Sequence, residues 1–299
     1  MKVAGIDIAL PVYWGAPGAY EHERCRFSIA GLGPMIAAAQ KLGANAPKIG
    51  LFYDASSLLN QFRGVEPRGG RPDLTTSQGR DVFCRTVTEY FERVPRNLWG
   101  RVEGRPLVVT YSSGFAARWD KNLGAHLRAA FAKRFPGEDV FLVTDVSWGE
   151  IGQDRITGWG AALNGPRLHP GVAQIGAGYN DTPVPGSKTP IRDREDGNYY
   201  RHSWRQALLH KPGLVLIETW NEMHEGTEIC ETLQTGTSYL DLTSEWIGKF
   251  KQGADPGPEI VLKWPSPRAR PDPTWGKEVA GKEIFKAGWQ INSNQETAP

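Results

Sequence analysis

The sequence predicts an α/β protein, specifically a (β/α)8 TIM-type barrel, on two observations. Short apolar segments alternate with longer amphipathic segments along most of the 299 residues. Each strand-plus-helix unit takes about 30–40 residues, which suits a barrel of eight units and roughly 250 residues. Strands of four to eight residues that are separated by helices of ten or more pair in parallel, because a parallel crossover needs a long connection.

Seven apolar segments are predicted to be strands: residues 3–13, 48–54, 106–112, 140–145, 152–160, 172–178 and 214–220. Helical periodicity predicts five helices: residues 28–43, 77–94, 118–134, 198–210 and 236–251. An eight-fold barrel needs eight strands, so either one strand is not recognised in the sequence or the first strand lies upstream of Met1. We favour the second explanation. A doubly wound open sheet is the alternative fold, but no G-x-G-x-x-G segment follows any strand, so dinucleotide binding has no support.

The composition changes after Gly253, where proline becomes frequent and the periodicity stops. We therefore expect residues 1–252 to form the catalytic barrel. Residues 253–299 are expected to be a Pro-rich linker or extension packed on it, with residues 260–262 and 284–289 as candidate strands of an incomplete β module.

The bulk charge excludes some classes of partner. There are 35 basic and 33 acidic residues, giving a net charge of +2 with no basic stripe. We expect no nucleic acid and no anionic membrane as partner. No apolar run reaches the roughly 18 residues of a membrane span. Asp7 and Pro11 interrupt any signal-peptide core, so localisation stays open, secreted or periplasmic if the native start lies upstream of Met1. The sequence does not indicate an oligomeric state.

Neither a metal nor a cofactor is predicted. Cys25, Cys84 and Cys230 show no metal-ligand spacing, and an odd number argues against a complete disulfide framework. No H-x-x-x-H or similar combination of His, Asp and Glu occurs. We expect free or buried thiols and a reaction that uses side chains alone.

Nearly every predicted strand ends in an aromatic residue beside a polar one. The carboxyl ends of barrel strands carry the active site, and 11 Trp, 9 Tyr and 11 Phe supply flat faces that suit sugar rings. We predict a lined sugar cleft. Its substrate-binding residues are predicted to be Tyr13, Trp14, Asp54, Tyr111, Asp145, Trp148, Tyr179, Asp181, Trp220, Asn221 and His224.

The strongest chemical signal is the pair Glu222 and Glu225, just after the last predicted strand. On a helical turn, side chains three residues apart share one face, with Cβ atoms about 5–6 Å apart. Two such carboxylates push each other's pKa values apart, so one acts as an acid and the other as a base. Retaining glycosidases hold their two carboxyl groups roughly 5–5.5 Å apart. The pair therefore predicts glycoside hydrolysis; a solvated acidic loop that caps the next helix is the alternative.

The residues around this pair resemble a known family. Glu218–Thr227 (E-T-W-N-E-M-H-E-G-T) resembles the W-N-E-W-H-E-G-T signature of glycoside hydrolase family 99, the endo-α-mannosidase type. Gly178–Pro183 (G-Y-N-D-T-P) resembles a second segment of that group, and Ala4–Gly15 resembles its second barrel strand. Over residues 3–250 the chain is most similar to a branch described as domain of unknown function 5010.

The resemblance implies roles for both carboxylates. The family's first Glu, here Glu222, acts as base on the sugar 2-hydroxyl and gives a 1,2-anhydro sugar. The second, here Glu225, protonates the leaving oxygen and then activates water, so configuration is retained. Met223 stands where the family has Trp, which leaves one wall of the sugar pocket, and hence the sugar and linkage, open.

Three further points remain open from the sequence. Glu218 shares strand parity with Glu222, so it is either a structural carboxylate paired with an Arg or Tyr, or a functional one. A non-catalytic sugar-binding barrel and an enzyme of polysaccharide assembly are alternative functions. A different glycosidase clan would need a nucleophile on a later strand, and only one helix and the Pro-rich segment follow Glu222.

Overall fold

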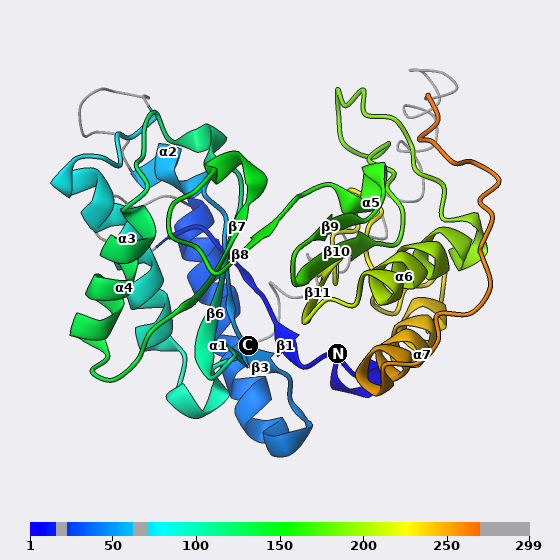
Figure 1. The fold of residues 1–299 in the computed structure, drawn as a ribbon, viewed down its shortest axis with the longest axis horizontal. Coiled ribbons are helices and arrows are strands. Elements are labelled where there is room, and N and C mark those ends of the chain that lie inside the picture. Colours follow the sequence, from blue (N-terminus) through cyan, green and yellow to red (C-terminus); the bar gives the residue numbers. More distant parts are fainter. Residues whose placement is uncertain (16–22, 62–70, 270–299) are drawn as a thin grey trace, which may run out of the picture. The chain divides into compact units, whose positions relative to one another are not determined.

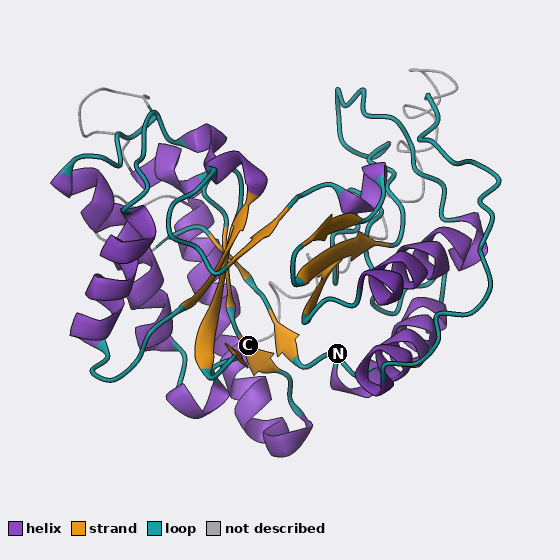
Figure 2. Ribbon diagram, in the orientation of Figure 1, coloured by secondary structure: helices purple, strands orange, loops and turns teal. Residues whose placement is uncertain are grey.

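The computed structural model describes residues 1–15, 23–61 and 71–269. The chain forms two compact units, an N-terminal unit (Met1–Trp159) and a C-terminal unit (Gly160–Pro299). Both units combine helices with a sheet, as Figure 1 and Figure 2 show.

The N-terminal unit is built on a parallel sheet whose strands follow one another in chain order. In spatial order they are β2 (Val12–Tyr13), β4 (Leu51–Tyr53), β6 (Arg105–Thr110), β7 (Phe141–Asp145) and β8 (Arg155–Thr157). β1 (Ile8–Ala9) and β3 (Lys48–Ile49) pair in parallel, and β5 (Arg101–Val102) lies antiparallel to β6. Parallel strands that neighbour each other in chain order are the pattern of a barrel wall.

Helices pack on one face of this sheet (Figure 1). They are α1 (Glu23–Leu42), the short α2 (Ser57–Gln61), α3 (Ser77–Arg93) and α4 (Leu123–Arg134). Leu51, Val108 and Leu142 on the sheet join Phe83 of α3 and Phe131 of α4 in one buried core. Because successive strand residues point to opposite faces, the residues between these, such as Phe52 and Val109, face away from the helices.

Local sequence explains where α3 begins. The Thr76 side chain caps the helix by accepting a hydrogen bond from the Gly79 backbone N–H at 3.1 Å. A Cβ at Gly79 would lie 2.2 Å from the Asp73 carbonyl oxygen, so only glycine permits this close entry into the helix. Apolar residues then recur at helical spacing and turn one face of α3 into the core.

The C-terminal unit has a smaller sheet. β10 (Val172–Gly176) pairs in parallel with β11 (Leu214–Glu218), and β9 (Arg167–His169) lies antiparallel to β10. Its helices are α5 (Ala161–Asn164), α6 (Asn198–His210) and α7 (Ser238–Gln252). The Tyr200 hydroxyl on α6 lies 3.0 Å from the Thr243 hydroxyl on α7, so a buried hydrogen bond joins the two helices.

Short 3-10 helices occupy several connections. They are Lys2–Ala4, Gly43–Asn45, Arg96–Leu98, Ser113–Phe115, Val146–Trp148 and Glu195–Gly197. The segment from residue 254 to residue 269 has neither strand nor helix. It is held by its backbone, because the N–H groups of Lys263 and Trp264 donate to the Glu195 carboxylate at 2.7 and 2.8 Å.

The predicted elements match these assignments closely. A strand lies in each of the seven predicted strand segments and a helix in each of the five predicted helical ones, and the α/β class is confirmed. The single strand predicted over residues 3–13 is instead two short strands, β1 and β2, after the 3-10 helix Lys2–Ala4, and the helix predicted from residue 118 begins at Leu123. The short elements β5, β9, α2 and α5 were not predicted, because two to five residues carry too little periodicity. Residues 260–262 form no strand, which corrects that prediction, and residues 284–289 lie outside the described part of the chain. Hydrogen bonds among the described strands do not close a complete ring.

Candidate active site

The loop that follows β11 carries both glutamates and is tied at its base. The Thr219 and Thr227 hydroxyl oxygens lie 2.7 Å apart, and the Thr219 N–H donates to the Thr227 carbonyl at 3.1 Å. The Ile229 N–H donates to the Thr219 carbonyl at 3.1 Å. These bonds fasten the two ends of the loop together, so the residues between them are presented on a short, closed turn.

Glu225 is the half-buried member of the pair. Burial raises the pKa of its carboxyl above the ordinary value, and the negative charges of Glu222 and Asp181 raise it further. Its backbone carbonyl accepts the Asn180 N–H at 2.7 Å, which fixes Glu225 against the segment after β10. A carboxyl that keeps its proton above its usual range is suited to act as a general acid.

Glu222 is the exposed member of the pair. Half of its side chain, 49%, is accessible, and its Oε1 atom lies 3.7 Å from Nδ1 of His224. Its backbone N–H donates to the Thr219 hydroxyl at 3.2 Å. We expected a helical turn here, but the structure has a simple turn over residues 223–226. The negative charge of Glu222 raises the pKa of Glu225, so the turn places the two carboxylates within electrostatic range of each other.

Gly226 allows this turn. Its φ of 57° lies in the left-handed region that favours glycine. A Cβ at this position would lie 3.1 Å from the Asn180 carbonyl oxygen, which is tighter than ordinary contact. The glycine therefore permits both the backbone conformation and the close approach of the loop to residue 180.

Tyr179 and Asp181 lie beside Glu225. The Tyr179 hydroxyl donates to Oδ2 of Asp181 at 3.2 Å, and the Ser187 hydroxyl donates to the same oxygen. Burial and the charges of Glu225 and Asp181 raise the pKa of Tyr179 above its usual value, so the phenol stays protonated. Asp181 is only 4% exposed, so its charge acts on Glu225 with little solvent screening.

The remaining predicted residues of this unit lie on the same loop. Trp220 is half-buried where β11 ends, while Asn221 and His224 are exposed. The C-terminal unit therefore gathers seven sequence-predicted residues around one turn: Tyr179, Asp181, Trp220, Asn221, Glu222, His224 and Glu225.

Glu218 has a structural role. Its carboxylate is 3% exposed and accepts the backbone N–H groups of Gly160, Ala161 and Ala162 at 2.9, 3.2 and 3.1 Å, and also the Gln174 amide. Burial raises its pKa to about 7, against the opposing effect of these hydrogen bonds. The partner expected from the sequence was an Arg or Tyr. Instead, backbone amides satisfy the buried carboxylate and fasten the end of β11.

The N-terminal unit brings Trp14 and Asp54 together at its strand ends. The indole N–H of Trp14 donates to Oδ2 of Asp54 at 2.5 Å, and the Ser56 N–H donates to Oδ1 at 2.9 Å. These two bonds orient the carboxylate and the indole toward each other. The pair thus offers an aromatic face and a fixed carboxylate within one small area, which suits recognition of a hydroxylated ring.

Tyr111 belongs to a partly exposed aromatic cluster. Its ring centroid lies 6.2 Å from that of Phe52 and 5.4 Å from that of Trp159, and the Phe52 and Trp159 centroids are 5.2 Å apart. Sequence reasoning missed Phe52 and Trp159. Strand parity was the available signal, because Phe52 precedes Asp54 by two residues and so shares its face.

Three predicted substrate-binding residues are buried within the N-terminal unit. Tyr13, 1% exposed, packs against Tyr90 with ring centroids 5.1 Å apart. Trp148, also 1% exposed, donates its indole N–H to the Tyr111 carbonyl at 2.6 Å. Asp145 accepts the N–H groups of Ser147 and Trp159 at 2.9 and 3.1 Å. These residues hold the strand-end loops in place and present little surface to a ligand.

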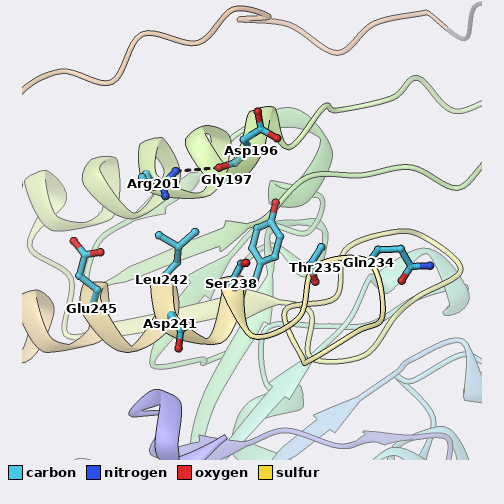
Figure 3. Close-up of a pocket in the computed structure, with 10 residues that line it drawn as sticks. Asp196, Gly197, Arg201, Gln234, Thr235, Ser238, Asp241, Leu242 and Glu245 are labelled. Carbon is cyan, nitrogen blue, oxygen red and sulfur yellow. Dashed lines mark hydrogen bonds between the residues drawn. The ribbon is translucent and has the colours of Figure 1, made fainter.

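The C-terminal unit also contains an open polar hollow of about 500 Å³ (Figure 3). Neither Glu222 nor Glu225 lines it. Its walls come from the beginning of α6, the beginning of α7 and the loop before α7, and Arg201 donates to the Asp196 carbonyl at 3.1 Å across one edge. The lining residues are Asp196, Gly197, Arg201, Gln234, Thr235, Ser238, Tyr239, Asp241, Leu242 and Glu245.

Over residues 1–15, 23–61 and 71–269, no group of three or more His, Cys, Asp or Glu side chains is placed to hold a metal ion. Cys84 is buried and Cys230 half-buried, both as free thiols; the side chain of Cys25 lies outside the described set. None of the helices in these ranges is both long and apolar enough to cross a bilayer.

Parallel strands in chain order, covered by helices, define an α/β barrel protein. The chain belongs to the family described as Domain of unknown function (DUF5010), whose model matches residues 1–251. Among curated proteins, it is 32% identical to the glycoprotein endo-alpha-1,2-mannosidase of Mus musculus over an alignment of 96 residues, covering 27% of this chain and 21% of the mouse protein. The Xenopus laevis protein of that name is 32% identical over 94 residues, covering 26% of this chain and 21% of its own length. The chain thus spans about a fifth of these relatives.

Solved structures share the fold. The GH99 endo-alpha-mannosidase from Bacteroides thetaiotaomicron superposes with a TM-score of 0.56 at 20% identity, covering 84% of this chain and 76% of that one. A structure described as a glycoside hydrolase-like protein gives a TM-score of 0.63 at 15% identity, covering 82% of each chain.

Proposed function

We propose that this protein is a retaining glycoside hydrolase in which Glu222 and Glu225 carry the reaction. The observation behind the proposal is the turn after β11. It holds an exposed carboxylate beside a half-buried one, and that second group keeps its proton above its usual pH range. Pairs of carboxyl groups in contrasting environments are how glycosidases separate the acid from the base.

In the first step, Glu222 takes the proton of the sugar 2-hydroxyl. The 2-oxygen attacks C1 as the C1–leaving-group bond breaks, which forms a 1,2-anhydro sugar. Glu225 gives its proton to the departing oxygen. The reaction therefore begins with Glu222 ionised and Glu225 protonated, and burial, which raises the pKa of Glu225, favours the protonated form of that carboxyl.

In the second step, Glu225 takes a proton from water, and the resulting hydroxide equivalent attacks C1. The bond between C1 and the 2-oxygen breaks, and the 2-oxygen recovers its proton from Glu222. C1 is inverted twice, so the product keeps the starting configuration. Both glutamates return to their initial protonation states.

An α-mannoside is the substrate class that we propose, because curated relatives are named glycoprotein endo-alpha-1,2-mannosidase. Within the C-terminal unit, Tyr179, Asp181, Trp220, Asn221 and His224 are the proposed sugar contacts. Within the N-terminal unit, we propose Trp14, Asp54 and Tyr111. We also propose that residues 1–252 carry the catalytic barrel and residues 253–299 an extension.

The decisive experiment is hydrolysis of α-mannans and of bacterial polysaccharides by the wild type and by Glu222→Gln and Glu225→Gln. Each amide variant should lose at least a hundredfold in rate, the usual effect of removing a positioned acid or base (roughly 10²–10⁴). The anomer formed first, followed by NMR, should keep the configuration of the substrate.

The matched control is Glu231→Gln, which removes an exposed carboxylate just beyond the tied loop. It should keep the wild-type rate, and all variants should unfold near the wild-type temperature. Wild-type rates in both amide variants on a cleaved glycan would refute the assignment. Tight binding of a glycan by the wild type, with no cleavage of any substrate, would instead favour a sugar-binding barrel.

A further inference from the structure

Arg194 lies directly beneath the catalytic turn. Its Nη2 atom donates to the carbonyl oxygens of Gly226 and Glu228, each at 2.8 Å. The same guanidinium pairs with Oε1 of Glu228 at 3.0 Å, and these two side chains are 19% and 13% exposed. Arg194 therefore holds the backbone of the three residues 226–228, which begin immediately after Glu225.

The rest of the Arg194 side chain is also held. A Cβ at Gly178 would lie 2.5 Å from Arg194 Cγ, so the absence of a side chain at 178 makes room for it. On the other side, the guanidinium carbon lies 4.4 Å from the centroid of the Tyr239 ring. A flat guanidinium suits this stacked position with several simultaneous acceptors, whereas a lysine ammonium is a compact point charge.

Backbone bonds connect Arg194 to the segment that carries Asp181. The N–H groups of Tyr179 and Arg192 each donate to the other residue's carbonyl, at 3.0 and 2.8 Å. The Asn180 N–H donates to the Glu225 carbonyl at 2.7 Å. Hydrogen bonds thus join the segments around residues 179, 193 and 226. The Arg194 side chain reaches from the middle segment to the catalytic turn.

We propose that Arg194 is a positioning residue, which fixes the half-buried place of Glu225 beside Glu222, Asp181 and Tyr179 by holding the backbone of residues 226–228. This inference rests on the proposed function. In this proposal Arg194 contacts no substrate atom and acts only through the backbone of the loop. When the grip is lost, the turn relaxes toward solvent and Glu225 loses both its burial and the close influence of the neighbouring carboxylates.

Arg194→Lys tests the idea, with Arg205→Lys as matched control. Arg205 lies on α6 and donates to the Gly257 carbonyl at 3.1 Å, away from the catalytic turn. Arg194→Lys should lower kcat about 10–100-fold with KM changed less than about threefold, because a misplacement near 1 Å costs this much. The alkaline limb of the pH profile should move to lower pH, since a more solvated Glu225 gives up its proton earlier.

A second variant separates the contacts. Glu228→Gln removes the ion pair but leaves the two carbonyl acceptors of Arg194 in place, so its rate should fall clearly less than that of Arg194→Lys. An Arg194→Lys enzyme with the wild-type rate, or one that loses rate with an unmoved pH profile, would overturn the proposal. A Glu228→Gln enzyme as impaired as Arg194→Lys would also overturn it.

A carboxyl titration followed by NMR tests the same inference without a measurement of activity. In protein labelled with ¹³C on the Glu carboxyl groups, with Glu225→Gln used for assignment, Arg194→Lys should lower the pKa of Glu225 by at least about half a unit. Arg205→Lys should leave it unchanged, and an unchanged value in both variants would count against Arg194. If the wild type cleaves no glycan, the proposed function fails, while this titration still decides the role of Arg194. Where Arg194→Lys is too unstable for kinetics at the assay temperature, the titration is recorded below its unfolding temperature and still decides that role.

Discussion

Replacement of Glu218 by Gln should change the stability of the protein in a pH-dependent way with a distinctive sign. Burial raises the pKa of this carboxyl from 4.5 to about 7. In the pH range between these values, the unfolded chain has lost the proton and the folded protein has kept it. The folding free energy of the wild type should therefore weaken as pH rises through this window, by about 3 kcal/mol in total, at roughly 1.4 kcal/mol per pKa unit.

The hydrogen bonds of Glu218 set the free-energy cost of replacing its carboxylate with an amide. Oε1 of Glu218 accepts three of the four hydrogen bonds, from Gly160, Ala161 and Gln174, and a Gln oxygen placed there keeps them. The amide nitrogen then faces the Ala162 N–H, which donates to Oε2 in the wild type. Two donors facing each other leave a buried group unsatisfied, at a cost of about 1–3 kcal/mol.

The unsatisfied donor lowers the stability of Glu218→Gln at every pH, whereas the wild type loses stability only at high pH, where Glu218 ionises. The variant should thus be clearly less stable than the wild type at pH 5, and the difference should shrink or reverse by pH 8. Urea unfolding of both proteins at pH 5, 6, 7 and 8 measures it. A stability difference that grows with pH would refute the reasoning, because it would mean that the four hydrogen bonds outweigh burial.

Two further substitutions probe the parts of the site. Gly226→Ala should lower kcat at least tenfold and cost about 1–2 kcal/mol of stability, because the backbone of residue 226 is in the left-handed region and lies close to Asn180. Activity and thermal unfolding measure the two effects. A variant with wild-type kcat and stability would contradict this prediction. Asp54→Asn should raise KM for the glycan about tenfold through weaker hydroxyl recognition. The Asn oxygen keeps the Ser56 bond while the amide nitrogen faces the Trp14 indole N–H, so the melting temperature should fall by a few degrees. An unaltered KM would remove Asp54 from the proposed contacts.

The sequence predicts the strands and helices well, because both depend on local patterns. β11 is an apolar run of the right length, and α3 repeats apolar residues at helical spacing after a capping Thr76. The turn that carries Glu222 and Glu225 could also be located from the sequence, since both residues follow that strand directly. A short stretch of sequence contains the whole signal in each of these cases.

What escaped the sequence depends on contacts between distant residues. The amides that bind Glu218 lie 56–58 positions before it, and Arg194 grips a loop 32 positions after it. The exposure of a side chain at a strand end also depends on residues that are distant in the sequence. Tyr13 and Trp14 are neighbours, yet the Tyr13 ring is buried against Tyr90 of α3 while the Trp14 indole bonds to Asp54. A pattern of aromatic and polar residues at strand ends marks the region of the site but not which ring faces it.

Three carboxylates stand within eight residues, and their surroundings give each a different task. Glu218 is enclosed by backbone amides and fastens the end of β11; Glu222 lies half in solvent beside His224; Glu225 is half-buried beside Asp181. Glu218 is only 3% exposed, so it presents almost no surface to a substrate although burial raises its pKa to about 7. The exposed carboxylate of Glu222 is open to a substrate hydroxyl, which suits the base that we propose. Of these three, Glu225 combines a raised pKa with a place on the presented turn, and this combination of burial and location, rather than either alone, is why we propose it as the general acid.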